Sequence, residues 1–204
     1  MSRFVDRGAI TAAYVGIGVA ITVAVSFLLI IPIEPVIWLL AVPAGLIIGY
    51  YANQRSNRRA GPWHRILQNG LFAGFVTGLS TAVLILVLKT IFFYADTGYP
   101  DFNRADQQGH PIPPSCQTGA DCVYSRYLAR AREEGSEPAF RAAGATDPAA
   151  FGKLYWDQQF TVAGALLIAT TAGGLGGAAM YGVLRPKPTS PGRETPITDT
   201  SVRV

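Results

Sequence analysis

The chain has 204 residues, of which 50% are hydrophobic and only 15% are charged. Soluble globular domains carry roughly 25% charged residues, so this composition argues against a soluble protein and favours one embedded in a membrane. The net charge of +4 would suit a nucleic-acid partner, but the sequence has neither a basic helix interleaved with aromatic residues nor a zinc-knuckle pattern. The sequence therefore predicts the lipid bilayer as a partner and no nucleic acid.

Four apolar stretches are long enough to cross about 30 Å of hydrocarbon as helices. The predicted spans are residues 9–31, 36–52, 66–94 and 160–184. The first is longer than the apolar core of a signal peptide and no clear cleavage site follows it, so it is expected to remain as an anchor. The second is near the short limit and carries Pro43 at its centre. These stretches predict an all-α integral membrane protein built as a four-helix bundle.

Basic residues are unevenly distributed among the segments that flank these spans. Segments 1–8, 53–65 and 185–204 are rich in arginine and lysine, whereas the turn 32–35 has neither. Segment 95–159 carries six basic and nine acidic side chains, a net charge of −3. Because loops rich in arginine and lysine stay in the cytoplasm, both termini are expected there and segment 95–159 outside. The predicted location is the plasma membrane, and the Ala-, Gly- and Arg-rich composition suggests a bacterium.

The only two cysteines, Cys116 and Cys122, lie in the predicted extracytoplasmic domain, six positions apart with Gly119 between them. Such a spacing can close a small ring, and disulfides persist outside the cytoplasm, so a structural disulfide is predicted. One alternative is a thiol-redox pair. The layout is similar to that of bacterial four-span disulfide-oxidising quinone reductases, although these use two cysteine pairs. The other is a metal site with His110 and Asp121, although structural zinc prefers tighter spacing. No metal or cofactor is expected.

The second half of this domain contains signals for three successive helices. Their candidate N-caps are Asp121, Ser136 and Asp147. The third helix is expected to run into the last span. On the first helix, Arg130 and Glu134 should form an i,i+4 ion pair. The face that carries Arg126 and Arg130 is either a solvated charged face or a site for an anion or an acidic partner.

Small residues recur at four-residue spacing within the spans. The predicted helix-packing residues are Gly70, Gly74, Gly78, Gly173 and Gly177. In lipid such ridges let helix backbones approach closely, either within this chain or on another subunit. Lys89 is the one Lys, Arg, Asp, Glu or His residue within a predicted span, about one turn from the outer end of the third span. Glu34 lies at about the same depth in the membrane, where the first span turns into the second. The two are predicted to form an ion pair, with extension of Lys89 to the headgroups as the alternative.

The sequence contains no nucleophile elbow, zinc-protease motif, phosphate-binding loop or dinucleotide fingerprint. The layout, with a tiny first outer loop and a large cysteine-bearing second one, resembles that of tetraspanins, whose double-cysteine–glycine motif is absent. These features favour a non-catalytic accessory or scaffold subunit that contacts a membrane-protein partner, or a second copy of itself, through glycine-rich helix faces and the outer domain. A membrane thiol-redox enzyme or a small-solute carrier is the alternative. The tail 185–204 is expected to be disordered.

Overall fold

The computed structural model describes residues 5–29, 34–56, 61–100, 108, 110 and 116–185. The regular structure of this part of the chain is α-helical, as predicted. The helices are α1 (Arg7–Leu29), α2 (Glu34–Gln54), α3 (Trp63–Ala95), α4 (Ala120–Glu133), α5 (Glu137–Ala142) and α6 (Pro148–Leu184). Three of them, α1, α3 and α6, are long and apolar enough to cross a membrane.

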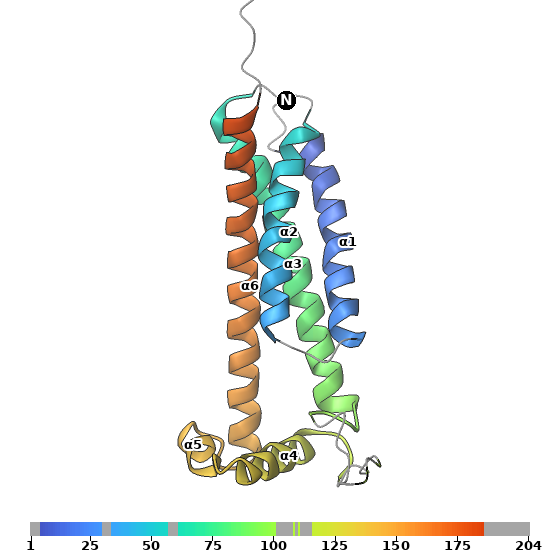
Figure 1. The fold of residues 1–204 in the computed structure, drawn as a ribbon, viewed down its shortest axis with the longest axis vertical. Coiled ribbons are helices and arrows are strands. Elements are labelled where there is room, and N and C mark those ends of the chain that lie inside the picture. Colours follow the sequence, from blue (N-terminus) through green and yellow to red (C-terminus); the bar gives the residue numbers. More distant parts are fainter. Residues whose placement is uncertain are drawn as a thin grey trace, which may run out of the picture.

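The four long helices stand side by side, and α4 and α5 lie across one end of them (Figure 1). Helices α2 and α3 contact each other, and each also contacts α1 and α6. Among the described residues, the backbones of α1 and α6 do not approach each other. The bundle therefore has α2 and α3 in the middle and α1 and α6 on opposite sides. We call the described residues 96–100 and 116–147, which include α4 and α5, the cap.

Helix α6 joins the cap to the bundle without a break. Its 37 residues correspond to about 55 Å, far more than the hydrocarbon thickness of a bilayer. The carboxylate of Asp147 accepts hydrogen bonds from the backbone N–H groups of Ala149 and Ala150, at 3.0 and 2.9 Å. The predicted N-cap and the predicted continuation into the last span are thus confirmed. The predicted boundary at residue 160 falls inside one continuous helix.

The predicted N-cap Asp121 is wrong, whereas the predicted N-cap Ser136 is confirmed in position but makes no capping hydrogen bond. Helix α4 has Gly119 at its N-cap, and Asp121 lies within its first turn. Ser136 does occupy the N-cap position of α5, but its hydroxyl donates to the carbonyl of Ala131 instead of capping the helix. Both short helices are therefore held by packing and by the turns around them. The predicted turn 32–35 falls mostly outside the described residues, as does the tail beyond Arg185.

Candidate functional site in the cap

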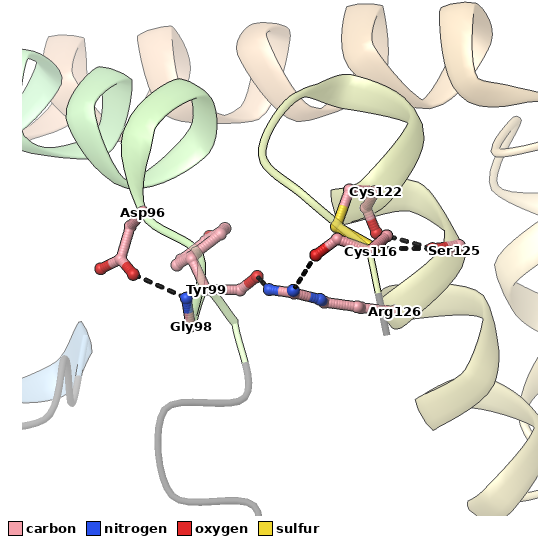
Figure 2. The surroundings of a disulfide bond; sticks show 7 residues. All are labelled: Asp96, Gly98, Tyr99, Cys116, Cys122, Ser125 and Arg126. Carbon is pink, nitrogen blue, oxygen red and sulfur yellow. Dashed lines mark hydrogen bonds between the residues drawn. A yellow bond between two sulfur atoms is a disulfide. The ribbon is translucent and has the colours of Figure 1, made fainter. Parts of the chain in front are cut away.

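Cys116 and Cys122 form a disulfide bond, as predicted, with their Cα atoms 5.6 Å apart (Figure 2). Cys122 belongs to the first turn of α4, whereas Cys116 precedes the helix. The two differ in exposure, because Cys122 is 6% exposed and Cys116 is partly exposed. The Ser125 hydroxyl donates to the Cys122 carbonyl at 2.8 Å. The ring that the disulfide closes is therefore attached to the start of α4.

Arg126 is a buried arginine that connects three parts of the cap. Its side chain is buried, at 5% exposure, and its two Nη atoms donate to the carbonyls of Tyr99 at 2.6 Å and of Cys116 at 3.1 Å. Figure 2 shows the guanidinium lying between these two carbonyls. The hypothesis of a solvated face carrying Arg126 is therefore wrong. Arg126 instead ties α4 to the chain that leaves α3 and to the disulfide ring, through hydrogen bonds strengthened by its charge.

Several other charged residues in or next to α4 and α5 form ion pairs at the surface. Arg130 and Glu134 form the predicted i,i+4 ion pair at 2.8 Å. Glu137 of α5 accepts from both Arg132 and Arg141, and hydrogen bonds from these two side chains lower the pKa of its carboxyl. Pairs exposed to this degree add little stability, so they define the polar surface of the cap rather than hold it together.

Three tyrosine hydroxyls from three segments meet where the cap packs against α6. Tyr99, in the turn after α3, lies 3.0 Å from the hydroxyl of Tyr127 in α4 and 3.0 Å from that of Tyr155 in α6. Burial, and then the two neighbouring phenols, raise the pKa of Tyr99 above its ordinary value. Nothing in the spacing of these residues along the chain indicated this cluster, because the segments meet only in the tertiary structure.

Aromatic rings continue from this cluster into the end of the bundle. Phe93 at the end of α3 is 1% exposed and packs against Tyr155, with ring centroids 4.7 Å apart. Tyr94 and Trp156 stack on each other at 6.1 Å, and Tyr94 is exposed. Aromatic residues at the end of a predicted span are usually expected to anchor the protein at the membrane surface. Phe93 and Tyr155 instead belong to the core between cap and bundle, and only Tyr94 and Trp156 remain at the surface.

The predicted helix-packing glycines lie where the backbones of α2, α3 and α6 meet. A Cβ atom at Gly70 would lie 2.6 Å from the carbonyl oxygen of Gly174, and one at Gly177 would lie 1.9 Å from that of Leu46. The same crowding against neighbouring helices holds for the other predicted glycines, which are Gly74, Gly78 and Gly173. These glycine faces are therefore occupied by helices of the same chain.

Lys89 is buried near the cap end of α3. Glu34 is the first residue of α2, and its side chain lies outside the described part of the structure. The Glu34–Lys89 ion pair therefore stays a prediction.

A polar cluster that the sequence did not indicate lies at the opposite end of the bundle. Asn53 of α2 donates to the Ile66 carbonyl of α3 at 3.1 Å, and Asn69 donates to the Asn53 side chain at 3.4 Å. The Ser56 hydroxyl donates to the carboxylate of Asp6, just before α1. These bonds hold the starts of α1 and α3 to the end of α2, a structural role that buried and paired polar groups commonly have.

Within the described residues, no three His, Cys, Asp or Glu side chains are grouped so that they could hold a metal ion, and His110 and Asp121 do not form such a group with the cysteines. Comparisons of the chain with protein-family models, curated proteins and solved structures give no match.

Proposed function

We propose that this chain is a non-catalytic accessory or scaffold subunit of a bacterial plasma membrane. Its cap serves as a docking platform outside the cytoplasm for a membrane-protein partner or a second copy of the chain. The observation that carries the proposal is the way in which the cap is joined to the bundle, by one continuous helix and by buried hydrogen bonds. Helix α6 is continuous from the Asp147 N-cap to Leu184, while Arg126 and the tyrosine cluster fix α4 against α3 and α6. A protein bound to the cap would therefore be held in a fixed position relative to the membrane helices.

The proposed topology has four spans, with α2 as the fourth. The 21 residues of α2 correspond to about 32 Å, which matches the hydrocarbon thickness, and α2 packs between the three helices that are long and apolar enough to span. An even number of spans places both termini on one side. The arginine-rich segments 1–8, 53–65 and 185–204 favour the cytoplasm for that side, which leaves the cap outside.

The exposed part of the platform is α5 and its surroundings. Helix α5 extends sideways beyond α6 (Figure 1), and none of its residues is buried. Its surface combines the paired charges around Glu137 with the small exposed residues Ala139 and Ala142. Because the glycine faces are occupied within the chain, the cap is the better surface for a partner. A non-obligate protein interface as a whole is about as polar as the rest of a protein surface, so the polar character of this face is compatible with docking.

Site-specific photocrosslinking followed by purification in a mild detergent tests this proposal. A photoreactive residue would replace Ala139 in α5 or, as the matched control, Ile168, which is exposed on the membrane part of α6. The proposal expects one protein, or a second copy of the chain, to be captured stoichiometrically from position 139 and not from position 168. A monomer that captures no protein from position 139 and retains a small solute would contradict it and favour a carrier.

A further inference from the structure

The two sulfur atoms of the disulfide lie in different surroundings. Cys116 is partly exposed and precedes α4, whereas Cys122 is 6% exposed and is the third residue of the helix. A thiolate that attacks a disulfide must reach one sulfur along the S–S axis, so the more accessible sulfur reacts. In this protein Cys116 is the more exposed of the two residues, and its Sγ lies 3.6 Å from the hydroxyl of the exposed Ser125, so Cys116 is the expected point of attack.

The same attack would leave the negative charge on Cys122, where two features stabilise it. The first turn of a helix favours negative charge, and the N-cap of α4 is Gly119, which has no side chain to satisfy the exposed N–H groups. The guanidinium of Arg126 lies one turn further along α4 and is hydrogen-bonded to the Cys116 carbonyl. The carboxylate of Asp121 opposes both, but it is exposed, so solvent and salt screen its charge. Accessibility and leaving-group stability thus favour the same direction of cleavage.

We propose that the Cys116–Cys122 disulfide is a thiol-exchange site for an external dithiol, with Cys116 as the attacked sulfur and Cys122 as the leaving thiolate. The first thiolate of the dithiol forms a bond to the Cys116 sulfur while the Cys116–Cys122 bond breaks, and its electron pair stays on Cys122. The second thiolate then attacks the dithiol's own sulfur in the mixed disulfide and releases Cys116. The protein disulfide gains two electrons and two protons, and the dithiol is oxidised to a disulfide. This role is independent of what the cap binds.

The hydrogen bonds of Arg126 determine what exchange changes in the cap. In the oxidised protein the Cys116 carbonyl is held both by Arg126 and, through the disulfide, by α4. After exchange the covalent link from Cys116 to α4 is lost, while the hydrogen bonds of Arg126 to the Cys116 and Tyr99 carbonyls and the tyrosine cluster are untouched. Exchange would therefore loosen the residues before α4 and leave α4 itself in place.

Mapping the mixed disulfide tests the direction of attack on the unmodified chain. The full-length protein in detergent micelles would be treated with 2-mercaptoethanol, an uncharged monothiol, and quenched with N-ethylmaleimide before peptide mass spectrometry. The proposal expects mercaptoethanol on Cys116 and N-ethylmaleimide on Cys122. Mercaptoethanol on Cys122, equal labelling of both cysteines, or a disulfide that reacts only after the protein is unfolded would each overturn it.

A charge substitution tests the leaving thiolate separately. Asp121→Asn removes the opposing charge from the first turn of α4 and should raise the second-order rate of cleavage by 2-mercaptoethanol about twofold. Asp157→Asn makes the same change on the exposed surface of α6 and should leave the rate unchanged. A rate for Asp121→Asn equal to that of the control, or below that of the unmodified protein, would show that Cys122 is not the leaving group.

Discussion

Arg126 donates a hydrogen bond from Nη1 to the backbone carbonyl of Tyr99 over 2.6 Å, although the two residues are 27 positions apart. This contact fixes the start of the cap against α4. The second Nη atom holds Cys116, so one buried cation joins the turn after α3, the disulfide ring and α4. The attachment of the cap to the bundle therefore depends strongly on this side chain.

Arg126→Met should loosen the cap. Methionine keeps much of the apolar stem but leaves the buried carbonyls of Tyr99 and Cys116 without their charged donor, which should cost about 3 kcal/mol. Hydrogen–deuterium exchange should accelerate in α4 while α1 and α2 stay protected. Arg130→Met is the matched control, because the Arg130–Glu134 pair is more than half exposed and its loss should change exchange little. Equal exchange in the two variants would show that Arg126 does not hold the cap.

Tyr99→Phe should destabilise the cap in a way that depends on pH. Below pH 10 the loss should be about 1–3 kcal/mol, because the Tyr127 and Tyr155 hydroxyls lose a buried partner. The pKa of Tyr99 is raised in the folded protein, so its contribution is present below the ordinary value of 10.0 and decreases as the pH rises above it. The difference in melting temperature between the unmodified protein and the variant should therefore shrink above pH 10. A difference that stays constant from pH 8 to pH 11 would argue against a buried, neutral Tyr99.

Gly174→Ala should disrupt the contact between α3 and α6. A methyl group at this position would lie 2.6 Å from the Gly70 carbonyl oxygen and 2.7 Å from the Gly74 Cα atom, so the helices must separate. Overpacking of this kind costs about 1–3 kcal/mol, measurable as a lower unfolding temperature in one detergent. Gly164→Ala on the same helix is the control, because a Cβ there meets no atom within 4 Å and should not lower the unfolding temperature. Equal unfolding temperatures would mean that the close glycine contact is not needed.

Asp147→Ala should fray the start of α6 at neutral pH. Hydrogen bonds from the Ala150 N–H, the Thr146 hydroxyl and the Ala149 N–H lower the pKa of Asp147 below its ordinary value of 3.8. A lowered pKa means that the stabilisation is present above that ordinary value and is lost as the pH falls through the folded-state value. Amide exchange at the first turn of α6 should therefore be faster in the variant at pH 7, and the difference in melting temperature should vanish in strong acid. A difference in melting temperature that persists in strong acid would show that the Asp147 side chain stabilises the start of α6 without its negative charge.

The long helices could be predicted from the sequence because uncharged apolar runs determine them. The predicted bounds of α1, α2 and α3 lie within three residues of the observed ones. The disulfide and the Asp147 N-cap could also be predicted from the sequence, because both depend on residues close together in the chain.

The contacts of the cap could not be predicted in the same way. Arginine on a short polar helix is usually exposed, and Arg126 is buried only because the chain after α3 folds back over α4. The glycine spacing indicated close helix contact, but only the tertiary structure shows that Gly70 and Gly74 meet Gly174 of the same chain. One sequence signal for Arg126 was available, because it follows Cys122 by one helical turn and so shares a face with it.

The central claim is that the cap stands outside the cytoplasm above four membrane-spanning helices. A fluorescent protein that matures only in the cytoplasm would be fused in turn to each terminus, and alkaline phosphatase, active only outside, would be inserted at Gly144 after α5. Fluorescence from both termini together with active phosphatase at Gly144 is the predicted result. Termini on opposite sides of the membrane would mean that α2 does not cross it. Inactive phosphatase at Gly144 with both termini outside would place the cap in the cytoplasm. Either result would contradict the account.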